Sequence, residues 1–247
     1  MDNKLNDFCG YSRIDENNFD NIKLKKKLKL ECDKFYSVAI NNLPNSEKIY
    51  SKLASKIRRK EYSSGGELLP RGYYCPSPIF DIVTGNCNRG KLLKRITSRS
   101  KPTYEYCFNN DNKLIIVNHL YEKCSEFLKY TDNVVVGITF SRGENVEIIS
   151  VIECLYDTNG RIVSYTVANS SFNDCHMDQL YKELYLYNQK GLYKAEIFDY
   201  LDDNQGGIVN HDIYSFKHDD DGYLNEYKVE TSYFKNDVYK ISVKRRL

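Results

Sequence analysis

Three tight-turn signals recur at one fixed spacing in the last part of the chain. Each is a short segment that ends in glycine: Tyr156–Gly160, Tyr187–Gly191 and His218–Gly222, which begin at a constant interval of 31. Glycine adopts positive φ at little cost, and a neighbouring Asn or Asp favours a tight turn. The same register aligns two columns of apolar residues, which are Cys154, Tyr185 and Phe216, and Val167, Phe198 and Val229. The spacing predicts three equivalent β-hairpin turns.

Short β-branched and aromatic runs precede this repeat and are separated by turn residues. The runs cover residues 104–108, 114–117, 134–140 and 146–152. Such runs are typical of strands, and the 22 tyrosines of the chain suit half-buried sheet positions. We expect a short helix at about 120–129 to interrupt them. Residues 104–247 are therefore predicted to form a large antiparallel β-meander of hairpins.

Residues 1–62 are predicted to be mainly helical. A first stripe with helical spacing consists of Leu24, Leu28, Cys32, Phe35 and Ala39, although the Lys/Leu alternation over 23–30 also allows a strand. A second helix is expected to begin at Pro44-Asn45-Ser46, which supplies its cap and entry, and to carry the stripe Ile49, Leu53 and Ile57. We expect it to close with Arg58–Lys60, because cations favour a helix C-terminus.

Residues 63–103 differ in composition from both neighbouring segments. They contain four of the five prolines and five glycines, which predicts mostly irregular structure. A connection of this length is uncommon in a compact domain, so it is either functional or packed across another element. The predicted fold class is α+β, with a helical region (1–62), an irregular basic segment (63–103) and an antiparallel β-sheet domain (104–247).

The start of the chain is polar, and no segment approaches 18 uninterrupted apolar residues. We therefore expect a cytoplasmic protein with no membrane partner. The eight cysteines have neither the paired spacing of a disulfide framework nor that of a zinc site, so we expect reduced thiols that are mostly core residues. No metal and no cofactor is predicted.

The turn units resemble the tyrosine-aspartate hairpins of YD-repeat proteins, which are related to Rhs toxins. The resemblance is carried by Tyr156-Asp-Thr-Asn-Gly-Arg-Ile-Val-Ser-Tyr165 and covers only the local turn pattern of the region that holds the three turns. The repeat period is longer here, and the other copies depart at Asn188 and His218. The resemblance implies a shared hairpin style and suggests an association with polymorphic toxins, such as that of an immunity protein.

Charge is distributed unevenly along the chain. Residues 1–101 hold 21 Lys and Arg against 11 Asp and Glu, whereas residues 102–247 hold 15 against 23. Ten of these acids lie between Ala195 and Glu230, several of them in expected loops. Loops at one end of a sheet cluster in space, so we predict an acidic patch that binds a basic partner. Its residues are Asp202, Asp203, Asp219, Asp220, Asp221 and Glu226.

A basic stretch within residues 58–101 offers an alternative interface. Its candidate residues are Arg89, Lys91, Lys94, Arg95 and Arg99, and aromatic residues such as Tyr73 and Tyr74 lie nearby in the sequence. Basic side chains mixed with aromatic rings can hold phosphates and stack bases. Gly85–Lys91 has the spacing of a phosphate-binding loop, but Leu92 stands where Mg²⁺ needs a hydroxyl. We interpret that segment as a basic glycine loop.

No set of residues predicts a reaction. Cys175 and His176 are adjacent, whereas a Cys–His pair normally converges from separate elements. A catalytic set could still include His176 or His211, so enzymatic activity stays open and no catalytic residue is predicted.

The first hypothesis is a non-catalytic binding protein, an immunity protein whose acidic loops neutralise a cognate toxin, for example a nuclease. The alternatives are a protein that binds or processes nucleic acid through 58–101, and a Tyr-rich saccharide-binding or structural β-module.

Overall fold

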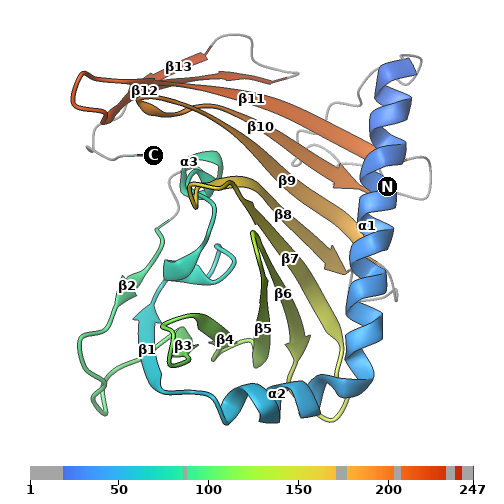
Figure 1. Cartoon of the computed structure of the whole chain (residues 1–247), viewed down its shortest axis with the longest axis vertical. Coiled ribbons are helices and arrows are strands. Elements are labelled where there is room, and N and C mark those ends of the chain that lie inside the picture. Colours follow the sequence, from blue (N-terminus) through green and yellow to red (C-terminus); the bar gives the residue numbers. More distant parts are fainter. Residues whose placement is uncertain (1–18, 86–87, 171–176, 203–206, 232–236, 241–246) are drawn as a thin grey trace, which may run out of the picture. The chain divides into compact units, whose positions relative to one another are not determined.

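The computed structural model describes residues 19–85, 88–170, 177–202, 207–231, 237–240 and 247 (Figure 1). The chain forms two compact units. We call residues 34–177 the central unit, and residues 1–33 with 178–247 the terminal unit. The described strand pairings inside both units are antiparallel, as predicted. The boundaries of the units do not coincide with the changes in composition at residues 62 and 103.

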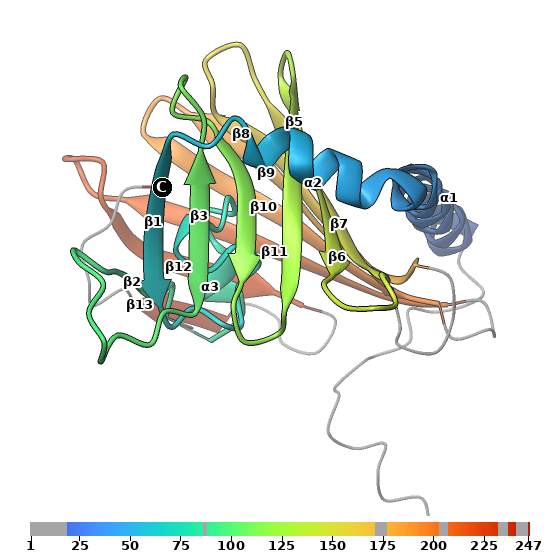
Figure 2. The ribbon, with the colours of Figure 1, turned by 90° about the horizontal axis from the view of Figure 1, so that it is seen from below.

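Two helices begin the described chain. Helix α1 (Phe19–Asn42) continues through a short 3₁₀ turn, η1 (Leu43–Asn45), into α2 (Ser46–Ala54). The stripe predicted for the first helix is confirmed, because Leu28, Cys32, Phe35 and Ala39 are buried. Helix α2 lies against β4 and β5 (Figure 2). Its residues Ile49 and Leu53, with the following Ile57, pack on a buried cluster that includes Ile116 and Phe127.

The predicted end of the second helix at Arg58–Lys60 is wrong. Helix α2 ends at Ala54, and Arg59 begins strand β1 (Arg59–Ser64). Arg59 and Lys60 each contact a residue of the neighbouring strand, which the sequence pattern could not identify. The guanidinium of Arg59 lies 3.9 Å from the ring centroid of Phe108, and Lys60 Nζ donates to Glu105 at 3.0 Å. These contacts with the neighbouring strand replace an interaction with a helix terminus.

The central unit has the strand order β2–β1–β3–β4–β5–β6–β7–β8. Besides β1, its strands are β2 (Lys91–Leu92), β3 (Tyr104–Phe108), β4 (Leu114–His119), β5 (Cys124–Thr131), β6 (Val134–Ser141), β7 (Ile148–Tyr156) and β8 (Ile162–Ser170). The four strands predicted between residues 104 and 152 are confirmed, with boundaries that differ by a few residues.

The helix predicted at about 120–129 is wrong, because this region is the β4–β5 hairpin. His119 and Cys124 are cross-strand partners, and Lys123 takes the positive φ of 50° in the turn between them. Residues 124–128 are all buried, so β5 lacks the alternation of a strand with one wet face. Phe127 and Leu128 follow Cys124 by three and four residues, which is also the spacing of an apolar helix face.

The Gly/Pro segment packs across the sheet of the central unit. It contains the 3₁₀ turn η2 (Gly72–Tyr74), the short helix α3 (Phe80–Val83) and β2. The buried hydroxyl of Tyr106 donates to Arg71 O at 3.0 Å and accepts from Tyr73 N at 3.1 Å. Of the two roles expected for a long irregular segment, packing across another element is confirmed.

The terminal unit has the strand order β9–β10–β11–β12–β13. The strands are β9 (Met177–Asn188), β10 (Gly191–Leu201), β11 (Ile208–His218), β12 (Leu224–Glu230) and β13 (Asp237–Lys240). The N-terminal part of α1 is tied to this sheet by two ion pairs, Lys29–Asp202 and Glu31–Lys182.

The hairpin turns occur where the constant interval predicts them. Gly160, Gly191 and Gly222 have φ values of 75°, 128° and 78°; Gly160 and Gly222 lie between two paired strands, and Gly191 is the first residue of β10, opposite Asn188 of β9. All six residues of the two aligned apolar columns are buried. Equivalent positions in the sequence thus have equivalent structural roles in the two units.

The five described cysteines are buried, as predicted for core residues: Cys32, Cys75, Cys107, Cys124 and Cys154. Among the described helices, none is both long and apolar enough to span a membrane.

Candidate functional site

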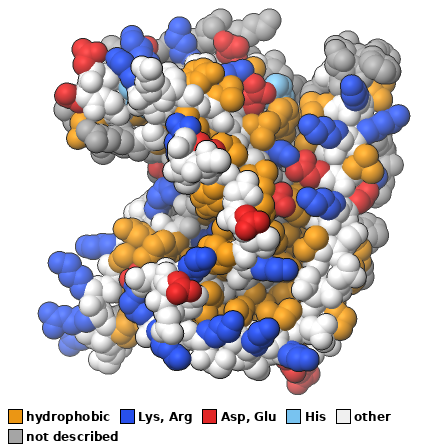
Figure 3. Space-filling view, in the orientation of Figure 1, with side chains coloured by type: hydrophobic (Ala, Val, Ile, Leu, Met, Phe, Trp, Pro, Cys, Tyr) orange, Lys and Arg blue, Asp and Glu red, His pale blue; other side chains and the backbone are white. Residues whose placement is uncertain are grey.

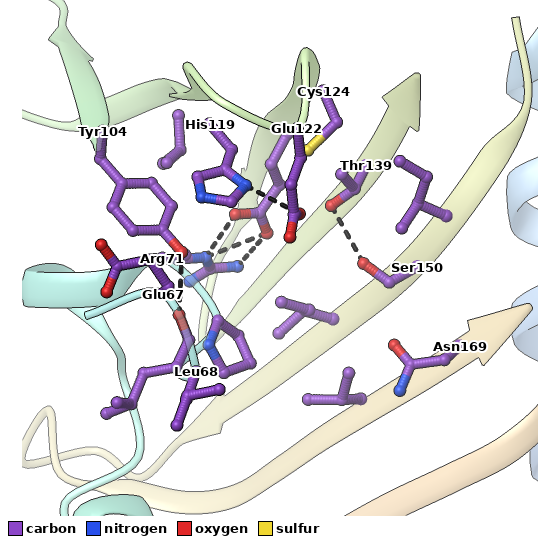
Figure 4. A pocket seen from close by; sticks show the side chains of 17 residues that line it. Glu67, Leu68, Arg71, Tyr104, His119, Glu122, Cys124, Thr139, Ser150 and Asn169 are labelled. Atoms are coloured by element: carbon purple, nitrogen blue, oxygen red, sulfur yellow. Dashed lines mark hydrogen bonds and ion pairs between the residues drawn. The ribbon is translucent and has the colours of Figure 1, made fainter. Parts of the chain in front are cut away.

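A pocket of about 230 Å³ with both apolar and charged lining residues opens in the central unit (Figure 4). One wall is formed by residues 67–71 of the Gly/Pro segment, and the others by strands β3 to β8. Its charged and metal-ligating side chains are Glu67, Arg71, His119, Glu122, Cys124 and Glu126. We call this site the Arg71 pocket.

A buried ion pair forms the floor of the Arg71 pocket. Arg71 Nε lies 2.8 Å from Oε2 of Glu126, and Nη2 lies 2.7 Å from Oε1, which is the bidentate geometry typical of strong pairs. Their side chains are only 4% and 5% exposed. Burial alone would lower the pKa of Arg71, but the Glu126 carboxylate outweighs that effect and raises it above its ordinary value. Arg71 therefore stays charged and neutralises Glu126.

Two unusual backbone positions make room for this pair. Arg71 itself has a φ of 62°, a left-handed conformation that is uncommon for a residue with a side chain. Gly137 on β6 lies beside the carboxylate, and a Cβ at that position would be 1.7 Å from Glu126 Oε1. Glycine in the middle of a strand is therefore explained by the close approach of the Glu126 side chain.

His119, the last residue of β4, is held by two neighbours. Its ring stacks on Tyr104 with a centroid distance of 4.6 Å, and its Nδ1 lies 2.7 Å from Oε2 of Glu122. The His119 side chain is 7% exposed, whereas that of Glu122 is 67% exposed. The other ring nitrogen, Nε2, is buried without a hydrogen-bond partner. In a neutral ring that donates from Nδ1, this Nε2 is a hydrogen-bond acceptor.

Cys124 lies opposite His119 in the β4–β5 ladder. Burial, with a further contribution from Glu122, raises the pKa of its thiol to about 11, so the free thiol is protonated at neutral pH. One ligand atom each of His119, Glu122 and Cys124 lie within 4.8 Å of one another. Figure 4 shows the His119 and Glu122 side chains pointing toward one another on the wall that Cys124 also borders.

The balance of polar groups favours a ligand that donates hydrogen bonds. Because Arg71 is engaged by Glu126, the carboxylates of Glu67 and Glu122 are the charged groups of the wall without a Lys or Arg partner among the described residues, and Glu122 contacts only His119 Nδ1. Glu67 accepts a hydrogen bond from Thr103 Oγ1 at 3.0 Å and is otherwise exposed. With His119 Nε2, these groups present acceptors and negative charge to anything that enters the pocket.

The structure does not bring the predicted acidic patch together. Asp202 follows β10, while Asp219, Asp220 and Asp221 follow β11, so the two groups lie at opposite ends of the antiparallel β10–β11 pair. The 11 residues of β11 correspond to a separation of roughly 35 Å. Consecutive turns of a meander alternate between the two ends of a sheet, which the prediction overlooked. Asp203 lies outside the described residues.

Most of the described acidic candidates also have basic neighbours. Asp202 pairs with Lys29, Asp220 with Lys190 at 3.3 Å, and Glu226 of β12 with Lys217 at 3.4 Å. Asp219 shapes its own turn, because its Oδ1 accepts from Asp221 N and Tyr223 N. The neutralisation of a toxin by these residues stays a prediction.

The basic candidates fall into two groups. Arg89 is structural, because its guanidinium donates to Cys75 O and Ser77 O and pairs with Asp81 at 2.9 Å. The other four are exposed and lie in and after β2, where Figure 3 shows Lys and Arg side chains gathered: Lys91, Lys94, Arg95 and Arg99. Of the nearby tyrosines, Tyr104 is buried and Tyr73 is 40% exposed.

The remaining candidates form no reactive set in the described chain. Cys175 and His176 lie outside the described residues, as do Asn86 and Cys87 of the glycine loop. His211 stacks on Phe198 at 4.4 Å and lies 3.6 Å from Glu196.

The Arg71 pocket itself was not predicted from the sequence. Two signals could have indicated it, namely Glu126 inside an apolar run and Gly137 inside a strand of β-branched residues. The apolar residues around Glu126 favour a helix in the sequence, and the β-branched residues around Gly137 favour an ordinary strand, so neither signal is distinctive without the structure.

No family model matches the chain, and a search of curated proteins finds no match. The resemblance to YD-repeat proteins therefore stays a prediction, and function must be argued from the site.

Proposed function

We propose that this protein is a non-catalytic binding protein that takes a small cationic ligand into the Arg71 pocket. The observation that carries the proposal is the buried, unpartnered Nε2 of His119 in a wall whose uncompensated charges are negative. A buried acceptor without a partner costs about 1–3 kcal/mol, which a ligand with an N–H group would recover.

The size of the pocket limits the ligand. A volume of about 230 Å³ is below the roughly 300–1,000 Å³ that is typical of sites for drug-sized molecules. It suits an alkylamine or a guanidine better than a nucleotide. Anionic ligands are disfavoured, because the positive charge of Arg71 is already compensated by Glu126.

The geometry supports binding rather than acid–base chemistry on the protein's own nucleophile. A His–carboxylate pair activates a hydroxyl or thiol when the second ring nitrogen is hydrogen-bonded to it. Nε2 of His119 has no such partner among the described residues. The pair therefore presents a fixed acceptor to a ligand.

Calorimetric titration with small cations tests the proposal. Chelator-treated protein is titrated with a diamine and with an alkylguanidine, and then with a diol and a dicarboxylate of matched chain length. We expect the cations to bind and the matched neutral and anionic compounds not to bind. Glu67→Gln and Glu122→Gln should each weaken binding about fivefold, because each removes roughly 1 kcal/mol of attraction at a solvated rim. Asp220→Asn, in the terminal unit, is the matched control and should leave affinity unchanged. Equal binding of all four compounds would refute the proposal.

A second candidate function, nucleic-acid binding, is favoured by one observation. Lys91, Lys94, Arg95 and Arg99 are exposed and form no ion pair with another described residue. Replacing all four by Gln should abolish salt-sensitive retention of single-stranded RNA in a polarisation assay. Retention that is unchanged by this replacement would exclude the candidate.

A further inference from the structure

We infer that the β4–β5 hairpin holds a zinc-class transition-metal ion between His119, Glu122 and Cys124, at the wall of the Arg71 pocket. The inference rests on the proposed function, since the ion would be the cationic ligand of the same pocket. The inference goes further than the proposed function, because it identifies the ligand as a metal ion and names three residues that bind it together.

The spacing of the three ligand atoms fits a tetrahedral ion after a small adjustment. They already lie within 4.8 Å of one another. Ligand bonds of about 2.0–2.3 Å to a tetrahedral zinc ion place its ligand atoms roughly 3.5 Å apart. Nδ1 of His119 and Oε2 of Glu122, which are 2.7 Å apart, need to separate slightly, while wider pairs need to draw closer; rotation about side-chain bonds can provide both changes.

The backbone of the hairpin fixes two of the ligands. His119 and Cys124 face each other in the ladder, so their side chains leave the sheet on the same side. The turn between them is held closed by Arg142, whose backbone N–H donates to Lys123 O at 2.7 Å. Glu122 is the adaptable member, because its side chain is largely exposed and can move toward an ion.

The orientation of the His119 ring determines which nitrogen would bind the ion. The side chain is more than nine-tenths buried, and the nitrogen that faces Glu122 is Nδ1, at 2.7 Å from Oε2. An ion shared by the two residues would replace the proton on Nδ1, and Nε2, which has no partner, would then carry the ring proton and become a hydrogen-bond donor. The stack against Tyr104 already holds the ring in place, so little side-chain freedom is lost on binding.

The donor set selects the class of metal. A thiolate and an imidazole favour zinc, cobalt or copper over calcium and magnesium, which take oxygen ligands. On binding, the Cys124 thiol releases its proton to solvent and the sulfur donates its electron pair to the ion; no electron is transferred. Three protein ligands leave a fourth position, which a water molecule or a pocket ligand would take.

The test uses the full chain after treatment with a chelator. Zinc is titrated by calorimetry, and cobalt is added separately to follow the thiolate-to-cobalt charge-transfer absorption. We expect one ion per chain, together with a cobalt spectrum that reports a sulfur ligand. Glu122→Gln, Cys124→Ser and His119→Phe should each weaken binding at least tenfold, by analogy with the roughly 10–100-fold losses seen even for groups that only support a ligand. His119→Phe keeps an aromatic ring against Tyr104, and Glu122→Gln changes an exposed side chain, so both variants are expected to fold.

Cys75→Ser is the matched control, because Cys75 is also a buried cysteine but does not line the pocket. It should retain both the affinity and the charge-transfer band. Absence of zinc binding, or binding that survives all three substitutions, would overturn the inference. If diamines bind and zinc does not, the inference fails and the proposed function stands. If zinc binds through these residues and diamines do not, the inference stands and the binding of organic cations fails.

Discussion

The central and terminal units contain buried or half-buried carboxylates in similar antiparallel sheets, but they compensate them differently. In the central unit, Glu126 pairs with Arg71, and Glu105 accepts from Lys60, Tyr62 and Asn118. In the terminal unit Glu196 pairs with Lys194, but Asp199 and Asp212 have no Lys or Arg partner among the described residues. Burial raises the pKa of both, and for Asp212 the neighbouring Asp199 adds to the effect.

This difference indicates which unit can present a binding site at neutral pH. In the central unit, Arg71 and Glu126 neutralise each other, so the floor of the pocket is preorganised. The remaining carboxylates, Glu67 and Glu122, lie at its rim. In the terminal unit, burial penalises the charged forms of Asp199 and Asp212. The acidic segment that the composition suggested is a weaker site for cations for a separate reason, because Asp202, Asp220 and Glu226 already pair with lysines.

The largest effect is expected from breaking the pair that defines the central unit. Arg71→Met or Glu126→Leu leaves one buried charge without its partner, which costs about 3–5 kcal/mol in the free energy of unfolding. The double variant removes both charges and should recover most of this loss. Urea unfolding followed by circular dichroism measures all four proteins of this double-mutant cycle.

The exposed pair Lys217–Glu226 of the terminal unit serves as the reference for this cycle. Its lysine is 67% exposed, so removing either partner should cost less than about 1 kcal/mol. If the losses of Arg71→Met and Glu126→Leu simply add in the double variant, the two charges do not compensate each other, and the contrast between the units is wrong.

A smaller loss is expected from Gly137→Ala, which tests the room that the central unit makes for its charge pair. The new methyl would meet Glu126 Oε1 at 1.7 Å and Arg71 Nη2 at 2.7 Å, so the side chains must shift. Overpacking of this kind costs about 1–3 kcal/mol. The same unfolding assay measures it, and the cost should fall when Glu126 is first replaced by Ala in an Arg71→Met background.

Gly143→Ala is the matched control, because a Cβ there meets nothing within 4 Å. It should be neutral or slightly stabilising. A loss at Gly143 equal to that at Gly137 would show that backbone flexibility, and not the charge pair, accounts for the effect.

The fold of the hairpins was predictable because it depends on local signals. The turn glycines Gly160, Gly191 and Gly222 need positive φ, and this need is visible in the sequence as a fixed spacing between turn residues. Strands such as β3 and β6 are equally local, since their β-branched and aromatic residues favour extended structure wherever they pair.

The pocket was not predictable in the same way. Arg71 and Glu126 are far apart in the sequence, and nothing in either neighbourhood identifies the other. The hairpin that joins His119 to Cys124 was hidden because a strand buried on both faces has no alternation. The predicted acidic patch does not form for a topological reason. Its residues are close in the sequence, but successive turns of a meander lie at opposite ends of the sheet.

The smallest effects are expected from single carboxylates and should have opposite dependences on pH in the two units. Burial alone would raise the pKa of Glu105, but the hydrogen bonds from Tyr62, Lys60 and Asn118 outweigh it and lower the pKa below 4.5. Its stabilising effect is therefore fully present above the unfolded-state value and is lost as pH falls through the lowered value. Glu105→Gln should destabilise the central unit by about 1–2 kcal/mol at pH 7 and have little effect near pH 3.

Asp199 should behave in the opposite sense in the terminal unit. Its folded-state pKa is raised above 3.8 by burial, so no penalty exists at low pH, where the group is protonated in both states. The penalty appears as pH rises through the unfolded-state value and is complete above the folded-state value. Asp199→Asn should therefore stabilise the terminal unit by about 1 kcal/mol at pH 7 and leave it unchanged near pH 3. Hydrogen exchange resolved by peptide assigns each change to its unit. A stabilisation that persists at pH 3 would mean that packing of the amide, and not removal of an uncompensated charge, is responsible.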